Sequence, residues 1–371
     1  MKKTFLMMLS CTFVILASQA DVKACTSIVI KTTDGSPIYG RTMEWGAFDL
    51  HAELVLVPRQ LSFTSELGGG RKGMTWKNKY GFVAMNAVKK PFVTDGMNET
   101  GLTLGVLYFP GFAEYQSFRD GEESHTLNNV DLSAYILGQF KTVNEIKADL
   151  PKLRVVYNKD IDKAFGAPAP LHLVATDSTG ASIVIEYVDG KLHIYDNTIG
   201  VMTNSPPYDW HILNLRNYPQ LTAFGGHADK NIKGVSLVPF GAGSGMLGLP
   251  GDVTPPSRFV RAVAFTSTTI PPENIASGIN EVSRILNNFD IPRGLVREGK
   301  SPEDYHLNFT QWSTIGDIKN RRYYWWTEFN RRMRMVDLKK LNFEGNKIRS
   351  IPLDEVRTED IKDRTNALIS R

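Results

Sequence analysis

Cysteine is nearly absent from this chain, with only 2 among 371 residues, and this scarcity excludes a disulfide-stapled scaffold. A large excess of either charge is also absent, because 43 Lys and Arg oppose 39 Asp and Glu and leave a net charge of +4. So small a surplus sets up no strong field for a polyanion, and we expect no nucleic-acid partner. Internal repeats, low-complexity segments and linkers rich in Pro, Gly or Ser are lacking too. The 42% hydrophobic and 22% charged residues indicate an ordinary packed globular protein.

The N-terminus has the three-part pattern of an export signal. Lys2 and Lys3 supply a positive end, residues 5–17 form an apolar stretch, and residues 18–24 form a cleavage region of small and polar residues. The apolar stretch is too short to span a bilayer comfortably, so we expect no stable membrane insertion. The pattern predicts an exported protein, periplasmic or secreted.

Two cleavage points fit the preference for small residues, one after Ala20 and one after Ala24. The second would leave Cys25 as the first residue of the mature chain. We therefore predict a signal peptide or propeptide at 1–24 and a single domain at 25–371.

The mature chain would carry one cysteine, because Cys11 lies within the signal. One interpretation of Cys25 is a small buried hydrophobic residue. A second is a non-enzymatic surface lipoprotein acylated at Cys25, although Asp21 and Lys23 separate this cysteine from the apolar stretch that an acylation site normally abuts. The third interpretation is catalytic, because cleavage would place the thiol beside a free α-amine.

Strand signals dominate the chain. The β-branched segment 25–30 lacks clean alternation, as expected of a strand covered on both faces. Asp34 and Gly35 then turn the chain, and residues 38–45 run back as the second arm of a hairpin. Further strands are predicted in a meander at 171–176, 182–187 and 192–195, and in a late hairpin at 323–327 and 333–336.

Helical spacing of apolar residues occurs at 132–150, with a break near Lys141, and at 272–288. These helices lie between blocks of strands and do not alternate with them. The pattern favours an α+β protein in which antiparallel sheets carry helices on their outer faces.

Several short motifs do not fit their usual context. Residues 294–301 match the P-loop pattern, but no buried strand precedes them and Pro302 blocks a following helix. Residues 243–248 match a dinucleotide-binding pattern and are also followed by Pro and Gly, so we interpret them as a loop. The His residues show no metal-ligand spacing, and no G-x-S-x-G elbow is present. The aromatic and basic residues of 321–334 resemble a platform for nucleic-acid bases, but a strand pair with packed aromatics and solvated arginines explains them equally well. Export and a near-neutral total charge favour the strand pair.

An N-terminal cysteine can be a catalytic pair by itself. Its amine titrates at roughly 7.7–8.0 and its thiol at about 8.5, so proton transfer between them is poised near neutral pH. A nearby cation would favour the thiolate. Arg41 lies on the returning arm of the first hairpin and can therefore lie beside Cys25.

A series of motifs in this order resembles one known family: a processed Cys opening a strand hairpin, Gly40-Arg41-Thr42-Met43-Glu44, Asp95-Gly96-Met97-Asn98-Glu99-Thr100-Gly101-Leu102, Tyr108-Phe109-Pro110-Gly111, Thr203-Asn204-Ser205-Pro206-Pro207 and Pro256-Ser257-Arg258-Phe259. The series is similar to the choloylglycine hydrolase and penicillin V acylase family of N-terminal nucleophile hydrolases. The resemblance runs from Cys25 to about Leu338. It implies a four-layer αββα sandwich of antiparallel sheets.

The resemblance also implies roles for individual residues. Cys25 would be the nucleophile with Arg41 close to its sulfur, and Asn204 would donate an amide N–H to the oxyanion. Arg258 matches the second family arginine. Glu44 stands where the family usually has an aspartate that is one methylene shorter.

Tyr108 lies at a position where bile-salt-cleaving relatives commonly have Asn and penicillin-cleaving relatives have Tyr; its backbone N–H can serve the oxyanion in either case. We expect hydrolysis of conjugated bile salts, with penicillin V acylase or a related N-acyl amide hydrolase as the alternative. The substrate would be a small amphipathic N-acyl amide, and no cofactor or metal is needed. Family analogy also suggests a homo-oligomer. The candidates for an apolar acyl pocket, besides Tyr108, are Trp45, Phe92, Met97, Phe109 and Phe112.

Overall fold

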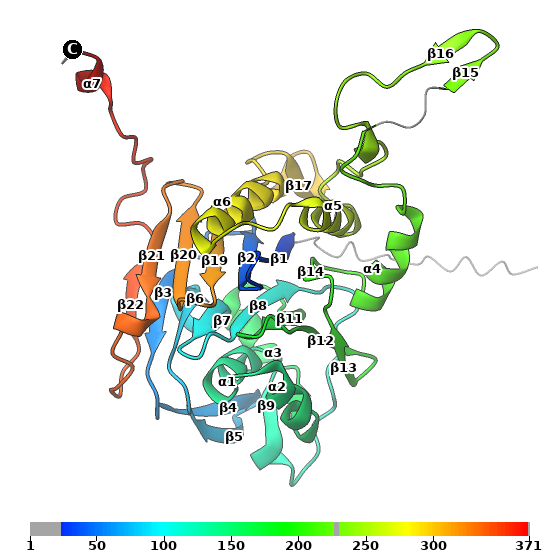
Figure 1. Ribbon diagram of the computed structural model, residues 1–371. Helices are drawn as coiled ribbons and strands as arrows, with labels where there is room; N and C mark the ends of the chain where they lie inside the picture. The colour runs from blue at the N-terminus through cyan, green and yellow to red at the C-terminus, as the bar shows by residue number, and fades with distance from the viewer. Residues whose placement is uncertain (1–23, 226–229, 370–371) are drawn as a thin grey trace, which may run out of the picture.

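The computed structural model describes residues 24–225 and 230–369, so the predicted export signal, apart from Ala24, lies outside the described residues. Two antiparallel sheets form the centre of the fold (Figure 1). The six-stranded sheet contains, in spatial order, β14 (Val201–Met202), β1 (Cys25–Lys31), β2 (Pro37–Glu44), β19 (Thr310–Asp317), β20 (Arg322–Thr327) and β21 (Arg334–Asp337). The eight-stranded sheet contains β13 (Lys191–Asp196), β12 (Ser182–Val188), β11 (Leu171–Thr176), β8 (Thr103–Tyr108), β7 (Lys90–Asn98), β6 (Phe82–Ala87), β3 (Glu53–Val57) and β22 (Arg349–Pro352).

The chain enters the six-stranded sheet through the predicted hairpin. β1 and β2 pair along their whole length, from Cys25 opposite Met43 to Lys31 opposite Pro37. The connecting turn is tight because Gly35 adopts a φ of +78°, a conformation that costs glycine little. Every residue of β2 is buried, since this strand lies between β1 and β19. The predicted hairpin is confirmed, and the expectation of a covered strand at 25–30 holds because these residues are buried apart from the half-buried Val29.

The other predicted strands are also confirmed. The meander is β11, β12 and β13 of the eight-stranded sheet, and the late hairpin is β20 and β21 of the six-stranded sheet. Tyr323, Trp325 and Trp326 of the late hairpin are buried, with at most 5% of each exposed. These aromatic residues therefore pack in the core and present no platform for nucleic-acid bases.

Helices cover the outer faces of both sheets. Those of the described residues are α1 (Asp131–Gln139), α2 (Val143–Asp149), α3 (Lys159–Phe165), α4 (Tyr208–Asn214), α5 (Pro255–Thr268), α6 (Ile275–Leu286) and α7 (Thr365–Ile369). α5 and α6 pack on the six-stranded sheet, and α1 packs on the eight-stranded sheet (Figure 1). One apolar cluster fills the space between the sheets and under α5 and α6, and another lies between the eight-stranded sheet and α1. The layers are helix, sheet, sheet, helix, as the resemblance implies.

The helix boundaries show what local pattern can predict. The break near Lys141 is real, because Thr142 caps α2 by accepting a hydrogen bond from the Glu145 N–H at 3.2 Å. α6 begins at Ile275, three residues later than the prediction, because Asn274 and Ser277 form a capping box there. α5 was not predicted, since arginines interrupt its apolar residues.

Four two-stranded sheets complete the described structure: β9 (Thr126–Asn128) with β10 (Arg154–Val156), β15 (Lys230–Ile232) with β16 (Val235–Leu237), β17 (Val296–Ser301) with β18 (Asp304–Asn308), and β4 (Ser62–Gly68) with β5 (Arg71–Lys77). The P-loop-like residues thus form part of a hairpin and precede no helix. Within residues 24–225 and 230–369, no helix combines the length and the apolar character needed to cross a membrane.

Candidate active site

The thiol of Cys25 lies at the beginning of β1, on the face that packs against the eight-stranded sheet. Because Cys25 is opposite Met43, the side chain of Arg41 shares this face. Nη2 of Arg41 donates a hydrogen bond to Sγ of Cys25 at 3.2 Å. Only 2% of Cys25 is exposed, so this contact is shielded from water.

Arg41 is held on all sides by acceptors from both sheets. Nη1 donates to the carbonyl oxygens of Thr94 and Val106 at 2.7 and 2.6 Å, and Nε donates to that of Thr42 at 3.2 Å. A carboxylate oxygen of Asp95 lies 3.8 Å from Nε. With these partners satisfied, Nη2 is left to face the thiol, and its direction is fixed by the backbone of two neighbouring strands.

Asp95 belongs to one of the motifs of the family resemblance, but the sequence assigned it no role. In the structure it supports Arg41. It accepts hydrogen bonds from the hydroxyls of Tyr39 at 2.8 Å, Tyr323 at 2.5 Å and Thr314 at 3.3 Å. Burial raises the pKa of Asp95 to about 6, although Arg41 and the hydroxyls act in the opposite direction. The carboxylate therefore anchors the arginine inside the interface between the sheets.

Asn204 and Arg258 meet on the other side of Cys25. The side-chain oxygen of Asn204 accepts from the Cys25 N–H at 2.6 Å and from Nη2 of Arg258 at 2.8 Å. Its amide nitrogen donates to the carbonyl of Tyr108 at 2.7 Å, which leaves one of its two N–H groups for another acceptor. Arg258, on α5, also donates to the Cys25 carbonyl and to the Thr26 hydroxyl. Three of the predicted site residues, Arg41, Asn204 and Arg258, thus contact the first residue of β1.

A buried polar network that the sequence did not reveal supports Asn204. Nε2 of His211 lies 2.8 Å from the Asn204 carbonyl oxygen, so this nitrogen carries the proton. Burial lowers the pKa of His211 to about 4 and keeps the ring neutral. Behind it, His172 bridges the Glu186 carboxylate and the Thr203 carbonyl, at 3.0 Å from each. Two of the seven histidines therefore have a structural role next to the site.

Glu44 ends β2 and is 1% exposed. One carboxylate oxygen accepts from the Thr310 hydroxyl at 2.7 Å, and the other has no hydrogen-bond partner among the described residues. Its backbone N–H donates to the Ala24 carbonyl at 3.1 Å. Burial raises the pKa of Glu44 to about 7, opposed by the positive charges of Arg258 and Arg41. This carboxyl can therefore change its charge near neutral pH.

Burial also raises the pKa of the Cys25 thiol, against the lowering effect of Arg41. Glu44 raises this pKa further, and Arg258 lowers it. A thiol in this position keeps its proton unless a base removes it. In the described residues Cys25 follows Ala24, so its nitrogen is a peptide N–H and cannot act as a base.

An apolar pocket of about 60 Å³ opens beside the thiol. Its lining comes from both sheets and from α3: Cys25, Met43, Trp45, Leu50, Phe92, Val93, Thr94, Val106, Tyr108, Val130, Ile161, Phe165, Pro168, Ala169 and Leu171. Trp45 has edge-on ring contacts with Phe165 at 5.0 Å and with Tyr108 at 5.9 Å between ring centroids. The walls next to the sulfur are therefore mainly aromatic and aliphatic.

Of the pocket candidates from the sequence, Trp45, Phe92 and Tyr108 line this cavity. Met97, Phe109 and Phe112 lie elsewhere. Met97 is fully buried in the core between the sheets, and Phe109 stacks on His172 at 4.4 Å between ring centroids.

Phe112 is 40% exposed and stacks on Phe109. The sequence missed Phe165 and Ile161, because α3 lies more than a hundred residues from Cys25 and carries no chemical motif. Only the folded sheets bring this helix to the thiol.

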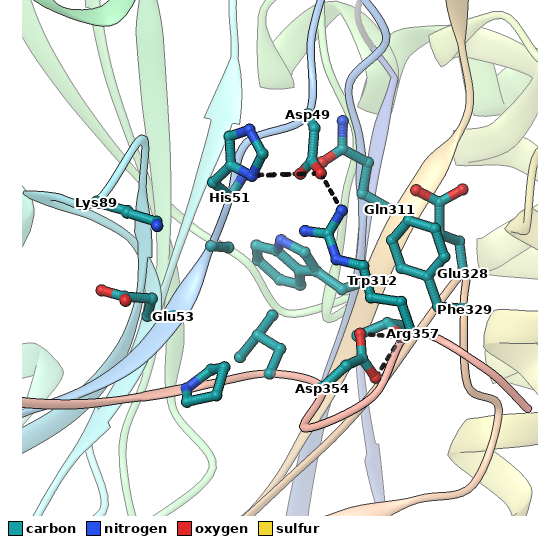
Figure 2. A pocket seen from close by; sticks show the side chains of 14 residues that line it. Asp49, His51, Glu53, Lys89, Gln311, Trp312, Glu328, Phe329, Asp354 and Arg357 are labelled. Atoms are coloured by element: carbon teal, nitrogen blue, oxygen red, sulfur yellow. Dashed lines mark hydrogen bonds and ion pairs between the residues drawn. The ribbon is translucent and has the colours of Figure 1, made fainter. Parts of the chain in front are cut away.

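A second cavity, of about 180 Å³, involves the segment that follows Trp45 (Figure 2). Here Arg357 of the C-terminal segment donates to Asp49 at 2.6 Å, and His51 approaches the same carboxylate. Gln311 and Trp312 form another part of the lining.

In the part of the chain that the structure describes, no group of three or more His, Cys, Asp or Glu side chains could hold a metal ion.

These layers, with a buried thiol at the first strand, are those of the N-terminal nucleophile hydrolases. Residues 25–351 match the model of the linear amide C–N hydrolases, choloylglycine hydrolase family. The chain belongs to this family and is an amidohydrolase.

The relatives named here cover almost the whole chain. A bile salt hydrolase/transferase of Clostridium perfringens is 32% identical over 329 residues, which are 88% of this chain and 96% of the relative. The solved structure of a mutant conjugated bile acid hydrolase from the same organism has a TM-score of 0.77 and 28% identity, and the match covers 92% of this chain and all of that one. A penicillin V acylase structure from Agrobacterium tumefaciens has a TM-score of 0.72 and 25% identity, over 90% of this chain and 95% of that one.

Proposed function

We propose that the mature protein hydrolyses the amide bond of glycine- or taurine-conjugated bile acids, with Cys25 as an N-terminal nucleophile. The observation that carries this proposal is the 3.2 Å contact between Arg41 and the thiol at the wall of an apolar pocket. An apolar acyl group in that pocket would place its carbonyl next to the sulfur. The name of the Clostridium perfringens relative supports bile salts as the substrate class.

Processing is part of this proposal. Export to the periplasm or the medium would remove residues 1–24 and convert the Cys25 nitrogen into a free amine. The side-chain oxygen of Asn204 is already 2.6 Å from that nitrogen and can hold it in place. The free carboxylate oxygen of Glu44 can then pair with the amine when it is protonated.

In the proposed reaction, the Cys25 amine takes the thiol proton while Sγ attacks the carbonyl carbon. The negative oxygen that forms accepts from the remaining Asn204 N–H and from the Tyr108 backbone N–H. The protonated amine then gives its proton to the leaving nitrogen, the C–N bond breaks, and glycine or taurine departs. Water attacks the thioester with the same amine as base, which releases the bile acid and restores the thiol. Arg41 stabilises the thiolate in both halves.

Amine release from taurocholate, glycocholate and penicillin V by the purified mature protein tests the substrate class. We expect both bile salts to be hydrolysed, and Cys25→Ser to fold but lose hydrolysis. No turnover of either bile salt would contradict the proposed substrate, and wild-type turnover by Cys25→Ser would contradict the nucleophile. Intact mass distinguishes the lipoprotein alternative, because an acylated Cys25 is heavier and has no free amine.

Penicillin V acylase is the second candidate function, and the pocket itself favours it. Its volume of about 60 Å³ lies below the roughly 300–1,000 Å³ usual for drug-sized ligands, so a steroid requires the pocket to widen. A phenoxyacetyl ring requires less space and suits the aromatic walls of Trp45, Tyr108 and Phe165. Faster turnover of penicillin V than of both bile salts would favour this candidate.

Assembly with further copies of the chain is also a proposal, first suggested by family analogy. The β15–β16 hairpin stands away from the body (Figure 1), and Ile232, Val235 and Leu237 on it are each at least 46% exposed. Apolar side chains on such a projection favour burial against another copy. Light scattering of the wild type and of Val235→Ser tests this, with a smaller species expected for the variant; a monomeric wild type would contradict it.

A further inference from the structure

The register of β19 against β2 shifts next to the site. Thr310 lies opposite Glu44 and Trp312 lies opposite Met43, so Gln311 is an extra residue between two consecutive pairs. Such a β-bulge redirects side chains that would otherwise alternate between the two faces of a sheet. All three residues are at most 6% exposed.

Each residue of this bulge contacts a different part of the site. Thr310 bonds to Glu44, and Gln311 bonds to the backbone of residues 45–50. The Trp312 ring has the Arg41 guanidinium 5.3 Å from its centroid, within the range of a cation–π contact. Three consecutive side chains thus contact the Glu44 carboxyl, the pocket segment at residues 45–50 and the Arg41 guanidinium, respectively.

The Thr310 hydroxyl connects Glu44 to the backbone of Ile291. It accepts from the Ile291 N–H at 2.9 Å, and an amide nitrogen can only donate. Its own proton is therefore free for Glu44, at 2.7 Å. The Thr310 N–H also donates to the Ile291 carbonyl at 3.2 Å, which fixes the threonine in two places.

The charged groups around Glu44 are few. Arg41 lies on its own strand, Arg258 faces it from α5, and Cys25 faces it from β1. Glu44 has one methylene more than aspartate, and this extra length gives its carboxyl more freedom. Thr310 removes that freedom by holding one oxygen, while the other oxygen has no hydrogen-bond partner among the described residues.

Gln311 acts on the pocket. Its amide nitrogen donates to the carbonyls of Trp45 and Phe48, at 2.9 Å each, and its oxygen accepts from the Leu50 N–H at 3.0 Å. Trp45 and Leu50 line the apolar pocket. Figure 2 shows Gln311 next to Asp49 of the same segment. One side chain thus fixes the backbone at two of the residues that line the pocket.

We propose that the bulge at 310–312 positions two parts of the site separately: Thr310 positions the Glu44 carboxylate, and Gln311 positions the acyl-pocket wall. Neither residue touches the reacting atoms, so both are positioning residues. This inference rests on the proposed roles of Cys25 and Glu44.

The first test compares the pH profile of kcat/KM between wild type and Thr310→Val. Loss of the hydroxyl removes a bond to the charged carboxylate, so the acidic limb due to Glu44 moves up by about one pH unit. At pH values below that limb, kcat/KM of Thr310→Val should be about tenfold lower than that of the wild type, with KM unchanged. Thr310→Ser restores the profile. Thr176→Val is the matched control, because Thr176 is equally buried and its hydroxyl bonds to Ser182 at 3.0 Å within the other sheet.

The second test uses Gln311→Met, which keeps the size of the side chain and loses all three bonds. KM for the amide substrate should rise about tenfold with kcat and the acidic limb unchanged. Gln311→Glu, which retains the acceptor for Leu50, should give a smaller rise. Thr310→Val and Gln311→Met with the same kinetic signature, or with changes in thermal stability alone, would overturn the proposal.

An inactive wild type would end the proposed function without deciding this inference. The pH profile of Cys25 alkylation by iodoacetamide then replaces turnover for the Thr310 part. A Glu44-dependent inflection that moves upward in Thr310→Val supports the positioning role, and superimposable profiles overturn it.

Discussion

Replacing Glu44 with glutamine should make the protein more stable in alkaline solution and hardly change it in acid. Glu44 is 1% exposed, and burial raises its pKa to about 7. Glutamine has nearly the same shape, keeps an oxygen for the Thr310 hydroxyl and never ionises. The variant therefore removes the cost of a buried negative charge while it preserves the packing.

The size of the effect follows from linkage. The folded-state pKa of about 7 exceeds the ordinary value of 4.5, so the folded chain binds the Glu44 proton more tightly than the unfolded chain. Stability from this proton is complete below about pH 4.5 and is lost as the pH rises through about 7. At 1.36 kcal/mol for each pKa unit, the loss is about 3 kcal/mol. Glu44→Gln does not undergo this loss of stability, because glutamine does not ionise.

Urea unfolding of wild type and Glu44→Gln at pH 4.5 and pH 8.5 measures the difference. The protein must retain Ala24 before Cys25, because a free amine there would add a positive charge beside Glu44 and lower its pKa. The gain of the variant should be about 3 kcal/mol larger at pH 8.5 than at pH 4.5. Glu303→Gln, at an exposed position, is the control. A gain independent of pH would refute the reasoning.

Three further changes have defined outcomes. Arg41→Lys keeps the charge, but lysine cannot reach the two carbonyls and the thiol together. The pH profile of Cys25 alkylation should therefore move to higher pH, and kcat/KM should fall about 100-fold. An unchanged alkylation profile would contradict the role of the guanidinium fork. Asn204→Ala should lower kcat by about 10²–10³ with folding retained, as measured by turnover and circular dichroism, and a change confined to KM would argue against an oxyanion donor. Arg357→Ala removes a half-exposed ion pair with Asp49 and a cation–π contact with the Phe329 ring, so urea unfolding should show a loss of about 1–2 kcal/mol, part of which high salt abolishes. A larger loss that does not depend on salt would be inconsistent with these surface contacts.

The elements that sequence predicted well are those with strong local signals. The hairpin of β1 and β2 has β-branched residues on both sides of an Asp-Gly turn, and Thr142 marks the break between α1 and α2. α5 was missed because it combines buried arginines with apolar residues, and a buried arginine has no periodic signature. Arg258 is in fact fully buried because its partners come from β1 and Asn204.

The residues of the site divide in the same way, into those that the sequence could indicate and those that only the fold brings to the thiol. Cys25 was found from its position after the predicted signal and Arg41 from its place on the first hairpin, whereas Glu44 and Asn204 were found only through the family resemblance. Pocket residues such as Phe165 are ordinary core-forming residues, and only the packing of distant segments decides whether they face the thiol. Phe109 was expected in the pocket as an apolar residue of a motif loop, but it directly follows β8 and its ring stacks on His172 instead.

Arg41 extends from one sheet to backbone carbonyls of the other, so the group that faces the thiol also joins the halves of the sandwich. A slight separation of these halves would withdraw the cation from the sulfur while every strand remained paired within its own sheet. On heating, enzymatic function should therefore disappear before secondary structure melts, and loss of turnover would give an early warning of loosened packing.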